Sequence, residues 1–179
     1  MVPRVWLAAG LSALAMAVAG CSADGTPAQA ARHGTTVPTP DLCTAIKRAT
    51  VRTALHSKTV RCATSGGAAG YSARFSGVAA LTGRHPATLT VAYEPRYDAK
   101  TGLDRWETLG RARGDRVSLF GVGQAAVFEA NAAPRPQLVT VQGDLIVAVT
   151  LRVSGAAVPQ DRLPDHLLEI GRQAVAAAS

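Results

Sequence analysis

The stretch LVTVQGDLIVAVTLRV, residues 138–153, decides the fold of this chain. Apolar and polar residues alternate from Leu138 to Val141, and the run from Leu145 to Val153 is rich in β-branched residues. Both features are typical of β-strands. Because the residues between the two runs, Gln142-Gly143-Asp144, favour a tight turn, the stretch predicts a β-hairpin.

Segments on both sides of this hairpin have the periodicity of regular elements. Further strands are predicted at residues 71–75, 88–93, 117–120 and 125–128, and a short helix at 101–113. Apolar residues three or four positions apart predict a first helix from Asp41 to about Leu55 and a last helix over about 161–177. The order of helix, strands and helix indicates an α+β domain with an antiparallel sheet.

A glycine motif lies between two of the predicted strands. Gly121-Val122-Gly123-Gln124-Ala125-Ala126 matches the G-x-G-x-x-A form of a dinucleotide-binding turn. That turn has to lead into a long helix, whereas Val127-Phe128 favours a strand and Pro134 follows soon after. We therefore interpret the two glycines as residues of a turn or bulge.

The residue types used for catalysis and metal binding are scattered along the chain. Ser65-Gly66-Gly67 lacks the residues that precede a catalytic serine, and no second ligand type follows a histidine at helical spacing. Grouped nucleophiles and acid pairs are also missing. The sequence therefore predicts a protein that is not an enzyme and that uses no metal or cofactor. The four histidines are His33, His56, His85 and His166.

The N-terminus has the regions of a secretory signal. A short basic start is followed by an apolar core from Val5 to Ala19, shorter than the roughly 20 residues of a membrane-spanning helix. The sequence Val18-Ala19-Gly20-Cys21 resembles a bacterial lipobox, whose cysteine is acylated with fatty acids such as palmitate. We expect a signal peptide at 1–20 and a lipid on Cys21; a plain signal peptide with a chance cysteine is the alternative.

Residues 21–40 are predicted to be the lipid anchor and a flexible tether, because they contain too few apolar side chains to fold. A single domain at 41–179 remains. The 179-residue chain is 47% hydrophobic with a formal charge of +7. We expect the domain at the outer face of the cytoplasmic membrane, where its charge favours anionic envelope surfaces over nucleic acid.

Cys43 and Cys62 are left once Cys21 is assigned to the lipid. An even number of cysteines in an exported chain favours a disulfide. The alternatives are a metal pair or a redox pair, but four ligands at close spacing and a two-residue spacer are both missing. We predict a structural Cys43–Cys62 bridge.

Two groups of residues are candidates for binding. The first is a basic cluster within 15 positions; a solvated helix face is the favoured interpretation, and anionic headgroups or wall phosphates are its candidate partners. The second is an aromatic patch with an arginine, since these side chains are the usual interface anchors; a hairpin that packs its aromatics on the core is the favoured interpretation of the same residues. The basic cluster is Lys47, Arg48, Arg52, Lys58 and Arg61, and the aromatic patch is Tyr93, Arg96, Tyr97 and Trp106.

The order of these features resembles that of small secreted lipoproteins of actinobacteria, assigned to a family of unknown function. The lipobox, the Thr/Pro tether, Pro40-Asp41-Leu42-Cys43, the second cysteine and the run from Val122 to Phe128 carry the resemblance. It implies a twisted antiparallel sheet flanked by an N-terminal and a C-terminal helix, without an assigned activity. The sequence departs from the family at Ala63-Thr64, where an aromatic residue is common.

These observations lead to two expectations of different classes. The first is a non-enzymatic accessory or sensor-like binding module that is anchored to the membrane and binds an envelope protein or an anionic surface. The alternative is a carrier that holds a lipid or another hydrophobic ligand in an internal cavity. A large apolar cavity would favour the carrier, and a filled core would favour the module.

Overall fold

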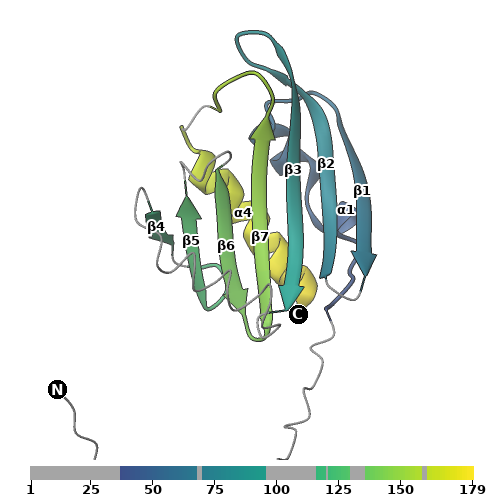
Figure 1. Cartoon of the computed structure of the whole chain (residues 1–179), viewed down its shortest axis with the longest axis vertical. Helices are drawn as coiled ribbons and strands as arrows, with labels where there is room; N and C mark the ends of the chain where they lie inside the picture. The colour runs from purple at the N-terminus through teal and green to yellow at the C-terminus, as the bar shows by residue number, and fades with distance from the viewer. Residues whose placement is uncertain (1–36, 68–69, 96–115, 120, 130–135, 159–160) are drawn as a thin grey trace, which may run out of the picture. The chain divides into compact units, whose positions relative to one another are not determined.

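A seven-stranded antiparallel sheet is the framework of the computed structural model (Figure 1). The structure describes residues 37–67, 70–95, 116–119, 121–129, 136–158 and 161–179. The strand order across the sheet is β1-β2-β3-β7-β6-β5-β4. The strands are β1 (Val60–Gly67), β2 (Gly70–Ala80), β3 (Arg84–Pro95), β4 (Arg116–Leu119), β5 (Ala125–Glu129), β6 (Gln137–Gln142) and β7 (Leu145–Val153).

The predicted hairpin is confirmed as the pair β6–β7. Gln142 pairs with Leu145 across a two-residue turn, in which Gly143 has a φ of +56°. That left-handed conformation is open to glycine at little steric cost. The α+β class with an antiparallel sheet is therefore confirmed. The four shorter predicted strands lie within β2, β3, β4 and β5. Phe120, at the end of one of them, lies outside the described residues.

The N-terminal helical segment is broken in two, where the sequence predicted one helix from Asp41 to about Leu55. The structure has α1 (Leu42–Ala45) and α2 (Arg48–Ala54), separated by Ile46 in an extended conformation. In a continuous helix, Val51 and Leu55 would fall off the apolar stripe. The break rotates the second half, so that both side chains are fully buried.

Asp41 begins the first of these helices. Its carboxylate accepts hydrogen bonds from the backbone N–H of Cys43 and of Thr44, as an N-cap does. The Thr44 hydroxyl also donates to it at 2.7 Å, and this side-chain hydrogen bond, with those from the backbone, lowers the pKa of Asp41. The predicted N-cap is therefore present, although the helix that it begins is only one turn long.

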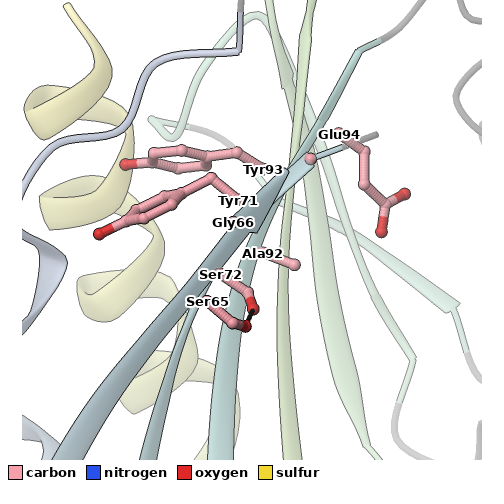
Figure 2. A pocket seen from close by; sticks show the side chains of 8 residues that line it. Ser65, Gly66, Tyr71, Ser72, Ala92, Tyr93 and Glu94 are labelled. Carbon is pink, nitrogen blue, oxygen red and sulfur yellow. Dashed lines mark hydrogen bonds between the residues drawn. The ribbon is translucent and has the colours of Figure 1, made fainter. Parts of the chain in front are cut away.

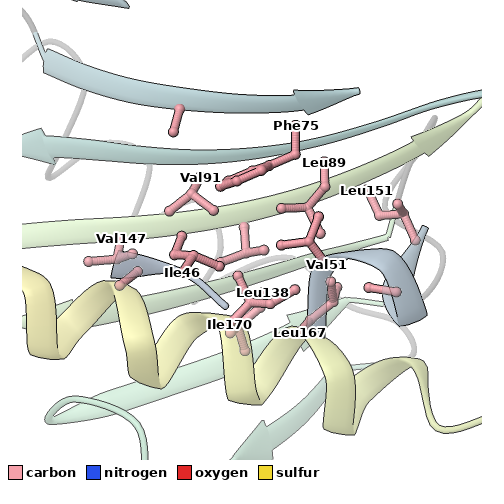
Figure 3. Packing of buried hydrophobic residues seen from close by; sticks show 14 of the residues in the cluster. Ile46, Val51, Phe75, Leu89, Val91, Leu138, Val147, Leu151, Leu167 and Ile170 are labelled. Atoms are coloured by element: carbon pink, nitrogen blue, oxygen red, sulfur yellow. The ribbon is translucent and has the colours of Figure 1, made fainter. Parts of the chain in front are cut away.

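The three described helices lie on one face of the sheet, with α4 (Leu163–Ala178) running behind the central strands (Figure 1). Figure 3 shows the core between them, where sheet residues such as Phe75 and Leu89 meet Ile46, Val51 and Ile170 of the helical layer. These side chains are at most 1% exposed. Burying one such side chain contributes about 1.5–3 kcal/mol, which makes this layer the main source of stability.

The opposite face carries a second, smaller buried cluster. Val139 pairs with Ala148 and Val141 pairs with Ile146, and all four side chains are at most 2% exposed. Their strand neighbours Leu138 and Val149 belong to the helix-side core. β6 and β7 are thus apolar on both faces over these positions, which explains the nearly unbroken apolar run in the sequence.

The predicted disulfide joins the helical layer to the edge of the sheet. Cys43 of α1 is bonded to Cys62 of β1, with their Cα atoms 5.7 Å apart. β1 was not predicted as a strand, because Ser65-Gly66-Gly67 interrupts it with residues of low strand propensity. Pairing with β2 along its whole length holds this segment extended.

The glycine motif forms a turn, as predicted, and β5 follows it where a dinucleotide-binding turn would need a helix. Gly121 and Gly123 have φ values of +82° and +56°. A Cβ on Gly123 would lie 2.5 Å from Thr140 Oγ1, so the turn can approach β6 only with glycine there. The helix predicted at 101–113, the signal peptide at 1–20, Cys21 and the tether up to residue 36 lie outside the described residues.

Candidate functional site

Opposite to the helices, the face formed by β1, β2, β3 and the Thr150–Arg152 end of β7 is called the open face below. Ile146 and Ala148, nearer the start of β7, belong to the smaller buried cluster and not to this face. Pairing register places two rows of polar side chains across it. Thr90 of β3 lies between Arg74 of β2 and Thr150 of β7 in one row. Thr88 lies between Ser76 and Arg152 in the next row.

Alternation in the sequence explains why these side chains share a face. Arg74 stands between Ala73 and Phe75, both fully buried on the helix side. Thr90 stands likewise between Leu89 and Val91, which are fully buried. Because side chains alternate across a strand, packing of the apolar residues against the helices turns the polar residues to the open face.

Arg74, Thr88, Thr90, Thr150 and Arg152 line a hollow of about 210 Å³, called the arginine–threonine hollow below. The arginines are exposed and the threonines are half-buried. The described residues that line it include no carboxylate, and their surface is formed mostly by hydrogen-bonding atoms. Guanidinium and hydroxyl groups together can donate hydrogen bonds to an anion from several directions.

A second hollow of about 350 Å³ lies at the end of the β1–β2 hairpin (Figure 2). The hydroxyls of Ser65 and Ser72 are 2.9 Å apart on the open face, joined by a hydrogen bond. Figure 2 shows the rings of Tyr71 and Tyr93 on the side of the strands that faces α4, away from Glu94. The ring centroids are 6.1 Å apart, and the planes are tilted by 40°.

Tyr93 was a candidate of the predicted aromatic binding patch, and packing of its ring on the core was the other interpretation. Its side chain is fully buried, and its hydroxyl donates a hydrogen bond to the backbone carbonyl of Ala174 in α4. Burial, together with the neighbouring Tyr71, raises the pKa of Tyr93 well above its usual value. Tyr93 therefore packs on the core, while Arg96, Tyr97 and Trp106 lie outside the described residues.

The predicted basic cluster is divided between the two faces of the sheet. Lys47, Arg48 and Arg52 stand at the start of α2 and along it, on the helix side, and Lys58 lies in the following loop. Arg61 pairs with Ser76 and so belongs to the open face. All five side chains are exposed, but they do not form one continuous surface.

Two further observations on the described residues concern metal ligands and membrane-spanning helices. In the described ranges, no three His, Cys, Asp or Glu side chains are grouped so that they could hold a metal ion. Among the same residues, every helix is too short or too polar to cross a membrane.

Comparison with protein-family models, with curated proteins and with solved structures gives no match to this chain. The arrangement of its own side chains is therefore the basis for a functional proposal.

The arginine–threonine hollow was not predicted from the sequence. Arg74 and Arg152 are far apart in the chain, and only the pairing β2-β3-β7 brings them to one place. A signal is present in retrospect: each hollow residue occupies a polar position in an alternating strand pattern. The pattern gives the face of each residue but not the strand order.

Proposed function

We propose that this chain is a lipoprotein anchored at the outer face of the cytoplasmic membrane, where it serves as a non-enzymatic accessory or sensor-like binding module. A lipid on Cys21 would hold it there, and residues 22–36 would be its tether, since Val37, predicted as part of the tether, packs against the core. The open face would be the binding surface, carried by a twisted sheet whose N-terminal and C-terminal helices close the other side.

The choice of the open face as the binding surface depends on one observation. The helix side of β3 is fully buried at Leu89, Val91 and Tyr93, whereas Thr88 and Thr90 on the open face are only half-buried. The helices therefore cover one side of β3 and leave its polar residues on the other. A rigid sheet holds side chains at fixed spacing, which lowers the entropic cost of binding.

The carrier function is less well supported. Between the helices and the sheet, the described core is filled by large side chains with no exposed surface, among them Phe75, Leu151 and Leu167. The two hollows of the open face have polar groups in their lining, whereas a lipid-binding cavity is mostly apolar. Native mass spectrometry of the chain purified from its host separates the two functions: a protein mass without lipid adducts supports the module, and a bound lipid supports the carrier.

Fractionation tests the anchor. The wild-type chain is expected in the membrane fraction, and the Cys21→Ser chain, which cannot be acylated, in the soluble exported fraction. The same membrane distribution for both chains would contradict anchoring through Cys21.

Photo-crosslinking in intact cells tests the binding surface. A photoreactive residue at Ser76 on the open face is expected to form a discrete adduct, and the same residue at Arg48 on α2 is the matched control. Equal adducts at both positions, or none at Ser76, would contradict binding at the open face.

A further inference from the structure

The arginine–threonine hollow has a geometry that backbone pairing fixes. Arg74 and Arg152 are separated by two strand spacings and two residue positions, which places their Cα atoms about 12 Å apart. Thr88 and Thr90 of β3 lie between them. Two arginine side chains of ordinary length can therefore meet above the threonine hydroxyls and bind one group jointly.

Among the described residues, the lining of this hollow carries two positive charges and no negative one. Arg61 and Arg84 belong to the same face, since Arg61 pairs with Ser76 and Arg84 is four residues from Thr88 along β3. Among the described strand residues of this face, the nearest acid along β3 is Glu94, four residues beyond Thr90 and therefore roughly 13 Å away. Glu129 lies in the same row as Thr90 and Thr150, two strand spacings beyond Thr150 and therefore about 10 Å from it, and it accepts a hydrogen bond of 2.9 Å from Gln137.

Neither hollow arginine has an ion pair or hydrogen bond to another residue of the described chain. By contrast, Arg172 is engaged within the chain, since its Nε donates a hydrogen bond to the carbonyl of Gly121. The guanidinium groups of Arg74 and Arg152 thus keep their donors available. Arginine presents these donors in a planar fork that fits the paired oxygens of an oxyanion.

The shape of the hollow favours a small tetrahedral anion. Two guanidinium groups and three hydroxyls surround it, whereas a planar carboxylate has only two oxygens to accept their hydrogen bonds. Its volume of about 210 Å³ is below the roughly 300–1,000 Å³ of sites for drug-sized ligands. A phosphoryl group with a few atoms of its ester fits both the donors and the size.

We propose that Arg74 and Arg152, with Thr88, Thr90 and Thr150, bind the phosphoryl group of a phosphate or phosphate ester on the open face. This inference rests on the proposed binding function and names its ligand class. The phosphoryl group can belong to a lipid headgroup or to a soluble phosphate, because both present the same oxygens to the hollow.

The test uses the full exported chain with Cys21→Ser, so that the lipid does not mask weak binding. Isothermal titration with inorganic phosphate measures the soluble source. Flotation with phosphatidylglycerol vesicles measures the headgroup source, and vesicles given the same negative charge by oleate lack the phosphoryl group. Variants are Arg74→Gln/Arg152→Gln and, as the matched control, Arg48→Gln/Arg52→Gln on α2, which removes the same charge from the other face.

Binding to phosphate or to phosphatidylglycerol is expected, with a loss of about tenfold or more in the open-face variant and about wild-type affinity in the α2 variant. Thr90→Val should weaken binding without a change in charge. If the glutamine variant does not fold, Arg74→Lys/Arg152→Lys keeps the charge and is expected to lose the bidentate hydrogen bonds and to bind more weakly.

Absence of binding to both probes would overturn the proposal, as would equal losses in both double variants or equal binding to oleate vesicles. Binding to phosphate alone identifies a soluble source, and binding to phosphatidylglycerol alone identifies a headgroup. If neither phosphate nor phosphatidylglycerol binds while Cys21-dependent anchoring and the Ser76 adducts are observed, the proposed binding module stands and this ligand is excluded. Loss of the anchoring or of the adducts would instead contradict the proposed function itself.

Discussion

The side-chain Oε1 of Gln173 accepts a hydrogen bond of 2.8 Å from the backbone N–H of Lys47, 126 positions earlier in the chain. Lys47 stands at the break between α1 and α2, where no helical carbonyl accepts from this N–H. Gln173 on α4 therefore satisfies a donor that the broken helix leaves open. Its own Nε2 donates to Glu169 at 2.7 Å, which fixes the orientation of the amide.

Gln173→Ala should destabilise the domain by about 1 kcal/mol, because it removes the acceptor for Lys47 N–H. Urea unfolding followed by circular dichroism measures the change. Glu169→Gln is the control: its side-chain carbonyl can still accept from Gln173, so it should stay close to wild type. Equal stability of Gln173→Ala and wild type would show that water replaces the glutamine without cost.

Tyr93→Phe should lower the free energy of unfolding by about 1–2 kcal/mol at neutral pH, because the buried carbonyl of Ala174 loses its hydroxyl donor. Tyr71→Phe is the matched control, since Tyr71 is half-buried on the neighbouring strand. Thermal unfolding of the three chains provides the measurement. A larger effect from Tyr71→Phe would contradict the assigned role of Tyr93.

The raised pKa of Tyr93 predicts a loss of stability in alkali. Above pH about 10, a tyrosine in the unfolded chain releases its proton, while buried Tyr93 keeps it. The folded state then binds more protons than the unfolded state, so the stability falls as the pH rises. Tyr93→Phe should fall less steeply than wild type between about pH 10 and 12 in urea titrations; parallel curves would contradict this.

Gly77→Ala should destabilise the domain by about 1–3 kcal/mol through overpacking. A Cβ there would lie 2.5 Å from Ser57 Oγ and 2.7 Å from the carbonyl oxygen of Thr59. Ser57 Oγ donates to that carbonyl and accepts from Val78 N–H, so it cannot move freely. Gly67→Ala, where a Cβ meets nothing within 4 Å, is the control and should cost much less when melting temperatures are compared.

Replacing both bridged cysteines, as Cys43→Ala/Cys62→Ala, should cost about 3 kcal/mol, because the unfolded chain regains the freedom of the closed loop. Unfolding in urea with and without reductant gives the value. Reductant should lower the stability of the wild type and leave the alanine chain unchanged. A similar reductant effect on both chains would mean that the loss does not come from this bridge.

The strands could be predicted where a single local pattern determined them. The run from Leu145 to Val153 coincides with β7, since its apolar residues and the turn at Gly143 agree. β1 was missed because its extended form depends on pairing with β2, which local propensity does not contain. The helix break at Ile46 was missed for a similar reason. Gln173, which accepts the hydrogen bond of the Lys47 N–H at this break, is distant in sequence.

The binding residues were harder to predict than the strands. Tyr93 was included in the aromatic patch because it begins a segment rich in aromatic and charged residues, although its alternation with Leu89 and Val91 already indicated the core side. Arg74 and Arg152 become neighbours only through the strand order. Alternation therefore predicts which face a residue occupies, and only the three-dimensional pairing shows which residues share a hollow.

The contact between β3 and β7 has a consequence for how the chain folds. Along the described sheet, the other pairings join strands that follow one another in sequence, whereas Pro95 and Leu145 are 50 positions apart. The described sheet thus consists of two meanders, β1-β2-β3 and β4-β5-β6-β7, each of which can form from local turns. The two meanders pair with each other through β3 and β7, and this pairing is called the seam below. Because long loops close slowly, we expect docking of the meanders at this seam to limit the folding rate. The arginine–threonine hollow spans that seam, so its ligand should bind the joined state and slow its separation.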